Sequence, residues 1–185
     1  MGAAPAHQVS GLLIVGHGRA GPSAAARRAA LLADLPGATF VTAATAESLG
    51  ELLARAPRAK AILLLEGDAL LTATDVAILI AELNAGEGAM SVAPKVVGPA
   101  RLVVANVAPL TLRAERPLDS GHPDVNVRRV GAALRGPVVL FRRSILLNVV
   151  RAAAPGDQIA DLVSMAAREG VVYQPKAEAF FSGIP

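Results

Sequence analysis

Two carboxylates separated by one glycine, Glu66-Gly67-Asp68, follow directly on an apolar run at residues 61–65. Residues two apart on an extended backbone point to the same side, so both acids can converge on one hard cation. Mg²⁺ and Mn²⁺ are typically held by one or two carboxylates together with the oxygens of a diphosphate. A second interpretation stays open, in which Gly67 forms a turn and Asp68 bonds a nearby backbone N–H.

A glycine-rich turn, Gly16-His17-Gly18-Arg19, follows another apolar run at residues 12–15. Its two glycines would let backbone N–H groups approach a phosphate, and the Arg19 guanidinium could pair with that phosphate. The motif lacks the further glycines of a dinucleotide fingerprint and the Lys-Ser/Thr of a P-loop. A purely structural turn is therefore the alternative.

The elements that would position both clusters alternate in type up to residue 86. Apolar runs occupy residues 12–15, 38–44 and 61–65, and helix-forming segments occupy residues 22–36, 45–56 and 72–86, with Thr45 as the candidate N-cap of the second segment. Continuous apolar runs that alternate with helices are typical of a parallel sheet covered on both faces. Ligands of such sheets bind beyond the carboxyl ends of the strands. We therefore expect both clusters at one sheet edge, with Ile14, Val41 and Leu64 in the core.

Beyond residue 86 the pattern changes. Strand-like segments occupy residues 90–98, 101–112, 136–143 and 171–181, and helix-like segments occupy residues 144–150 and 157–170. Residues 113–129 combine prolines, glycine and charges, and few apolar residues interrupt them. We expect this segment to be a mobile surface loop.

Composition bounds the possible functions. The chain has 185 residues, 53% of them hydrophobic and 18% charged, which indicates one folded domain and excludes extensive disorder. Without cysteine, it has no disulfide, thiolate metal site or cysteine nucleophile. Aromatic residues make up 3%, and basic pairs such as Arg27-Arg28 are interpreted as solvated, so no nucleic-acid partner is expected.

We also find no targeting signal in the sequence. No apolar stretch is long enough for a transmembrane segment, and the first eight residues do not resemble a signal peptide. The cytoplasm is the expected location. We expect residues 1–10 to be a flexible N-terminus and residues 11–185 to form the single domain.

Two later segments, "GPVVLFRRSIL" and "REGVVYQPKAEAFF", follow the acidic motif in an informative order. This order resembles the family-2 inverting glycosyltransferases, which have the A-type nucleotide-diphospho-sugar transferase fold. The resemblance is best over residues 59–89 and 136–181. It implies a bacterial α/β protein with a single-domain mixed, mostly parallel sheet and helices on both faces, and a nucleotide-sugar donor as its small-molecule partner.

The resemblance assigns roles to individual residues. Glu66 and Asp68 match the first and last acids of the family's D-x-D motif, which binds Mn or Mg and the donor diphosphate. Arg142 and Arg143 match two family arginines, which adds them to Gly16, Gly18 and Arg19 as expected substrate-binding residues.

The catalytic base falls in the segment before residue 170. A gapless alignment matches Asp161 to a family position in the acidic helix, and a two-residue insertion would bring Asp157 to the place of the base. An active enzyme would use one of them to deprotonate an acceptor hydroxyl. From its local sequence alone, Asp157 is instead a candidate helix N-cap.

Several family features are missing, which keeps other functions open. The gapless alignment places Gln158 and Ile159 at the family's Glu-Asp pair, and the run at 38–44 lacks the aspartate that usually grips the base. The alternative is therefore a catalytically degenerate protein that acts as a binding or assembly partner, or as a homo-oligomer. A third reading, a small tetrapyrrole chelatase, comes from "LLIVGHG" and needs a second histidine such as His122.

Overall fold

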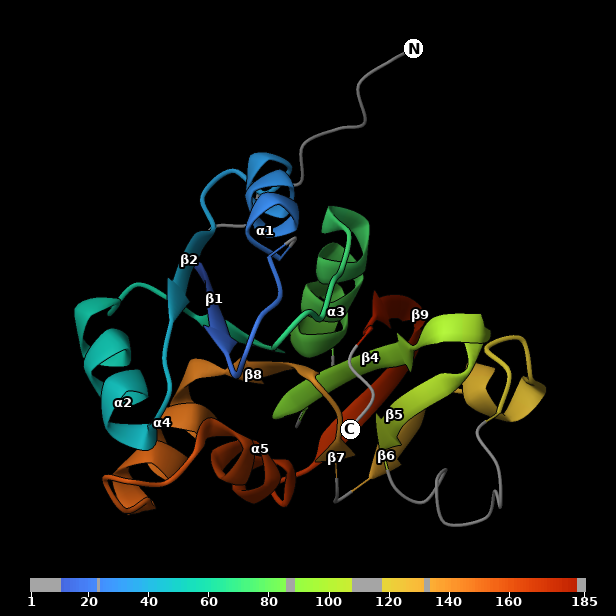
Figure 1. The fold of residues 1–185 in the computed structure, drawn as a ribbon. Helices are drawn as coiled ribbons and strands as arrows, with labels where there is room; N and C mark the ends of the chain where they lie inside the picture. The colour runs from blue at the N-terminus through green and yellow to red at the C-terminus, as the bar shows by residue number, and fades with distance from the viewer. Residues whose placement is uncertain (1–10, 23, 86–88, 108–117, 132–133, 183–185) are drawn as a thin grey trace.

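The computed structural model describes residues 11–22, 24–85, 89–107, 118–131 and 134–182. Its first half alternates strand and helix as predicted: β1 (Leu12–His17), α1 (Ala24–Ala33), β2 (Thr39–Thr42), α2 (Ala46–Arg55), β3 (Ala61–Glu66) and α3 (Ala73–Ala85). β1 pairs in parallel with β2 on one side and with β3 on the other. Figure 1 shows these elements from blue to green.

Within the described residues, the second half completes a mixed sheet of nine strands. It contains β4 (Ser91–Val97), β5 (Val103–Val107), β6 (Arg129–Gly131), β7 (Leu134–Arg135), β8 (Val138–Arg142), α4 (Arg143–Ala152), α5 (Ile159–Ala167) and β9 (Val171–Phe180). β8 lies antiparallel between β3 and β4, and β9 runs parallel to β4. The expected α/β fold with helices on both faces is confirmed.

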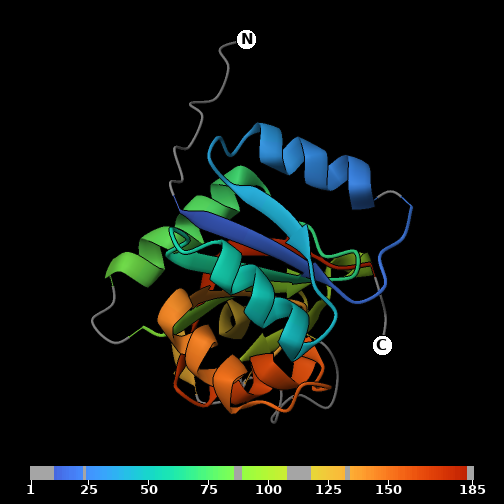
Figure 2. The same cartoon turned by 90° about the vertical axis from the view of Figure 1, so that its left-hand side faces the viewer.

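Two hydrophobic cores lie on the two faces of the sheet. Alternate residues of β1 and β3 enter different cores: Ile14 and Leu63 pack with α1 and α3, whereas Val15 and Leu64 pack with α2, α4 and α5. Figure 2 shows the resulting three layers, with α1 and α3 on one side of the sheet. Ile14 and Leu64 are buried as expected, and Val41 in the edge strand β2 is partly buried.

Local hydrogen bonds explain where two helices begin. Thr45 and Ser48 form a reciprocal capping box at the start of α2, so the predicted N-cap is confirmed. At the start of α3, the Thr72 N–H donates to the Asp75 carboxylate at 3.0 Å and the Asp75 N–H donates to the Thr72 hydroxyl at 3.2 Å. Among the described residues, no helix is long and apolar enough to cross a membrane.

The polar segment expected as a mobile loop is anchored in its described part. Residues 118–129 include Val125, whose side chain is 0% exposed and whose carbonyl accepts a 2.7 Å bond from the Tyr173 hydroxyl. The buried Lys95 ammonium also donates to two oxygens of the segment. The expectation that this stretch lacks anchors is wrong here, because one valine and two distant partners in β4 and β9 hold it. Residues 113–117 lie outside the described part.

Burial of the third strand gives a stability prediction. Leu64→Ala removes a side chain that is 1% exposed and should lower the free energy of unfolding by about 2 to 5 kcal/mol in urea denaturation. The matched control is Val130→Ala, because Val130 is 67% exposed; its effect should stay within about 0.5 kcal/mol. Equal effects of the two substitutions would contradict the assignment of β3 to the core.

Candidate functional site

The carboxyl ends of β1, β2 and β3 meet at one edge of the sheet, because the three strands are parallel. His17 lies opposite Glu66 across the β1–β3 pair, and Gly16 lies opposite Thr42 across the β1–β2 pair. The Gly67 N–H donates to the His17 carbonyl at 2.8 Å. The structure therefore brings the glycine-rich turn and the acidic motif together.

The acidic motif forms a tight turn. Gly67 has φ +51°, and a Cβ placed on it would lie 3.0 Å from the Arg19 carbonyl oxygen, so both its conformation and its surroundings favour glycine. The Asp68 Oδ1 accepts a 2.6 Å hydrogen bond from the Gly21 N–H. Asp68 thus ties the loop at residues 18–21 to the end of β3, as the turn interpretation requires.

Glu66 lies against the same loop, but its carboxylate does not bond the loop as that of Asp68 does. A Cβ on Gly18, which has φ +70°, would lie 3.4 Å from the Glu66 Cγ. In the part of the chain that the structure describes, no hydrogen bond or ion pair engages the Glu66 carboxylate, and no group of three or more His, Asp or Glu could hold a metal. Two carboxylates alone fit a divalent ion only when other oxygens, such as those of a diphosphate, complete its shell.

A hollow of about 570 Å³ opens beside this edge. Its walls come from the ends of β1 and β2, the start of α2 and the residue before α5, and its polar side chains are His17, Arg28, Thr42, Thr45, Ser48 and Gln158. This volume lies within the range of small-molecule sites, about 300 to 1,000 Å³.

Gly16 has a packing role in the wall of the hollow. A Cβ on Gly16 would lie 2.7 Å from the Phe40 Cζ and 3.4 Å from the Arg28 guanidinium. Gly16 therefore leaves room for an arginine stacked on a phenylalanine ring, with 4.9 Å between the guanidinium carbon and the ring centroid. Any larger residue at position 16 would displace this pair.

His17 contributes a neutral ring to the hollow. Burial lowers the pKa of His17 from 6.5 to about 4, because the charged imidazolium would lose its hydration. At neutral pH the ring can therefore donate and accept a hydrogen bond without adding charge.

The two arginines that the family resemblance assigned to substrate binding, Arg142 and Arg143, lie away from the hollow. Arg142 pairs with Ala61 at the start of β3, because β8 runs antiparallel to β3, so both Arg142 and Arg143 sit at the opposite edge of the sheet. Arg142 donates to the Leu83 and Ala89 carbonyls at 2.5 and 2.7 Å. Arg143 donates to the Leu53 carbonyl at 2.8 Å. The structure does not bring either side chain to the hollow.

Neither candidate base lines the hollow, although Asp157 directly precedes Gln158, which does. The Asp157 Oδ2 accepts a 2.9 Å bond from the Ala154 N–H, and its carbonyl accepts from the Ala46 N–H at the start of α2. Asp157 therefore does not cap α5, whose N-cap is Gln158. Asp161 is exposed in the first turn of α5, and Arg19 is exposed on the loop before α1.

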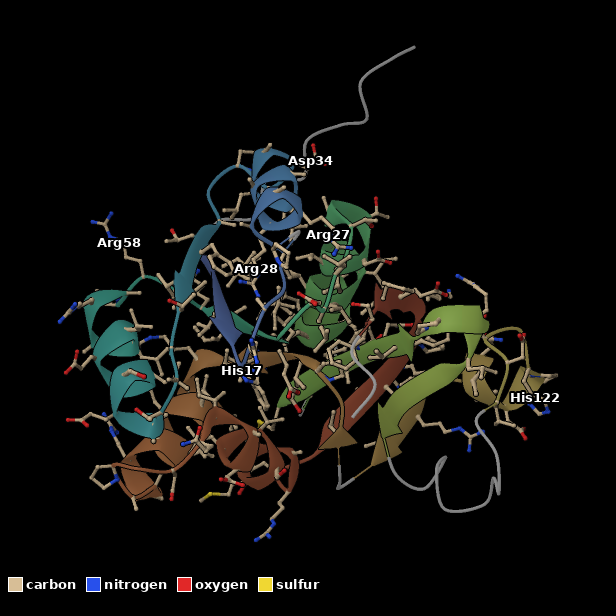
Figure 3. All side chains as sticks on the ribbon, in the orientation of Figure 1. His17, Arg27, Arg28, Asp34, Arg58 and His122 are labelled. Carbon is tan, nitrogen blue, oxygen red and sulfur yellow. The ribbon has the colours of Figure 1, made fainter. Side chains whose placement is uncertain are left out.

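The other histidine that the structure describes, His122, lies outside this arrangement. Figure 3 shows His122 far from His17, at the end of the molecule that carries the segment before β6. His122 accepts from the Asp124 N–H at 3.2 Å, and His7 lies outside the described residues. The structure does not pair His122 with His17 as a chelatase would need.

Sequence reasoning missed Arg28, Thr45 and Ser48 as residues of the hollow. Thr45 was expected only as a helix cap, and Arg28 was interpreted as a solvated charge. The only sequence signal for Arg28 was its place in the helix that follows the glycine-rich turn, and this did not reveal that it points back toward β1.

Comparison with known proteins defines the class of fold. No protein-family model and no curated protein matches the chain. Among solved structures, GalNAc-T7 with UDP, GalNAc and Mn²⁺ is similar at TM-score 0.61 and 8% identity, covering 94% of this chain and 43% of that one. A mycobacterial protein is similar at TM-score 0.53 and 15% identity, covering 95% of this chain and 68% of that one.

These similarities show the fold alone. The chain has the α/β architecture of A-type nucleotide-diphospho-sugar transferases, and it spans less than half the length of GalNAc-T7. Identities of 8% and 15% do not carry activity from one protein to the other.

The Asp68–Gly21 bond gives a testable stability difference. Asp68→Ala removes the acceptor and should lower the free energy of unfolding by about 1 to 3 kcal/mol, because a part-buried N–H loses its partner. Asp68→Asn keeps an oxygen at the same place and should lower the free energy of unfolding clearly less than Asp68→Ala. Equal losses for both variants in urea denaturation would contradict a specific Asp68–Gly21 bond.

The lowered pKa of His17 predicts a pH dependence of stability. Between pH 6.5 and about 4 the unfolded chain binds a proton at His17 that the folded chain does not, so stability should fall as the pH falls through this window. His17→Gln should make the decline between these pH values shallower, as measured by urea denaturation at a series of pH values. An NMR titration midpoint for His17 near 6.5 would contradict the burial argument.

Proposed function

We propose that this chain is a glycosyltransferase-like protein that binds the nucleoside diphosphate part of a nucleotide-sugar in the hollow at the carboxyl ends of β1 and β2. The observation that carries the proposal is the position of this hollow, beside a two-carboxylate motif in an A-type transferase fold. The similarity to GalNAc-T7, which was crystallised with UDP, GalNAc and Mn²⁺, supports the same ligand class.

The hollow offers groups suited to a nucleoside. Thr45, Ser48 and Gln158 supply hydroxyl and amide groups, and neutral His17 can donate or accept one hydrogen bond. Glu66 and Asp68 would hold Mn or Mg together with the diphosphate, and the bound ion would neutralise the charge of the leaving group. The protein's own part is to present these oxygens on a loop that Asp68 already holds in place.

In the transfer reaction that we propose, an acceptor hydroxyl attacks the anomeric carbon of the donor with inversion. The bond from that carbon to the diphosphate oxygen breaks, and the hydroxyl proton passes to a carboxylate. Asp161 is exposed and its carboxylate has no hydrogen bond or ion pair within the described residues, whereas Asp157 is engaged with the Ala154 N–H. Of the two, Asp161 therefore has the carboxylate that is free to accept a proton.

A second function, binding or assembly without transfer, has observations in its favour. The two family arginines bond backbone carbonyls at the far edge of the sheet, and Asp157 bonds its own loop. A protein of this kind would keep the hollow and lack the transfer step.

Calorimetric titration of UDP and GDP, each with and without Mn²⁺, tests the proposal. At least one nucleotide should bind more tightly with Mn²⁺, and Asp68→Asn should weaken this metal-dependent binding about tenfold or more, which is ~1.4 kcal/mol. The matched acid-to-amide control is Asp34→Asn, since Asp34 is exposed at the end of α1, away from the hollow (Figure 3).

The outcomes separate the two functions. Metal-dependent binding without sugar transfer to any acceptor would favour the binding protein. Absence of binding for both nucleotides with Mn²⁺ and with Mg²⁺ would contradict the proposed function.

A further inference from the structure

Arg28 lies against the ends of all three strands at the site edge. From α1, its Nη2–H donates to the Gly67 carbonyl after β3 at 2.7 Å, and its guanidinium stacks on Phe40 of β2. The same guanidinium lies 3.4 Å from the Cβ position of Gly16 in β1. Figure 3 shows Arg28 on the β1 side of α1, whereas the neighbouring Arg27 lies toward α3.

Part of the Arg28 guanidinium has no protein partner among the described residues. Its Nη2 bonds Gly67, but its buried Nε has no hydrogen-bond partner. Its Nη1 lies over Gly16 in the wall of the hollow and takes part in no hydrogen bond with a described residue. A guanidinium with unused donors beside a hollow is suited to a ligand with several acceptor oxygens.

The charge of the hollow points to the same class of ligand. Among the described residues that line it, Arg28 is the only arginine or lysine, none is an aspartate or glutamate, and His17 is neutral at pH 7. Thr45 and Ser48, at the N-terminus of α2, line the hollow, and this helix end adds partial positive charge. The hollow therefore favours an anion.

We propose that Arg28 binds the phosphate oxygens of the ligand, and that it couples this ligand to the Glu66-Gly67-Asp68 turn through the Gly67 carbonyl. The inference rests on the proposed function and deepens it. Arg28 takes the place expected for Arg142 and Arg143, which lie at the other edge of the sheet and donate to backbone carbonyls there. The stack on Phe40 and the bond to Gly67 hold the guanidinium in position before the ligand arrives.

The test compares three probes on one set of variants by calorimetry: UDP, uridine and inorganic pyrophosphate. Arg28→Gln should weaken UDP and pyrophosphate binding at least tenfold and leave uridine binding unchanged, because uridine carries no phosphate. Arg28→Lys should bind UDP and pyrophosphate with affinities between those of the wild type and of Arg28→Gln, since lysine keeps the charge but loses the planar fork. The control is Arg58→Gln, which also removes one charge, from a side chain that points into solvent near the amino end of β3 (Figure 3).

A purely structural role would give a different pattern. If Arg28→Gln weakens UDP and uridine equally, or weakens neither, the inference is overturned while the proposed function stands. If wild type binds pyrophosphate through Arg28 but binds no nucleotide, the inference about the anion stands and the proposed function fails. Failure of wild type to bind either UDP or pyrophosphate overturns both.

A measurement on the wild-type chain covers the case in which the variants do not fold. The Nε–H of Arg28 is buried, so its proton and nitrogen NMR signals should be observable. These signals should shift when pyrophosphate is added and should not shift with uridine. An Arg28 signal that stays unchanged at saturating pyrophosphate would overturn the inference.

Discussion

The parallel pairing of β1 with β2 and β3 is the constraint on which the candidate site depends. The register sets His17 opposite Glu66 and Gly16 opposite Thr42, so three strand ends from separate parts of the chain open at one edge. A shift of this pairing by one residue would turn each side chain to the other face and move Ile14 and Leu64 out of their cores. The same burial that stabilises the sheet therefore positions the site.

Hydrogen bonds at that edge hold the loops together as one unit. The Gly67 N–H bonds the His17 carbonyl, the Gly21 N–H bonds Asp68, and Arg28 bonds the Gly67 carbonyl. The acidic motif is thus both a turn and a ligand candidate: Asp68 holds the loop, while Glu66 stands beside it without a partner among the described residues. A divalent ion held here would depend on the diphosphate for further oxygens.

The parts of the fold that depend on local sequence were predictable. Apolar runs and helix caps such as Thr45 located the first six elements, and the parallel-sheet rule placed Gly16 and Glu66 at one edge. Features that depend on distant partners were not predictable in the same way. The direction of β8 decides where Arg142 lies, and a hydrogen bond from Tyr173 anchors Val125. Likewise, the rotation of α1 decides that Arg28, and not Arg27, reaches the hollow.

The central claim is that a nucleoside diphosphate binds at the carboxyl edge of β1, β2 and β3. Backbone amide NMR of the wild-type chain, titrated with UDP and Mg²⁺, tests it most directly because it locates the ligand. We expect shifts confined to residues 16–21, 42–48 and 66–68, to Arg28 and to the segment around Gln158, with Arg142 and Arg143 unaffected. Shifts centred on Arg142 and Arg143, or no shifts at saturating UDP, would contradict it.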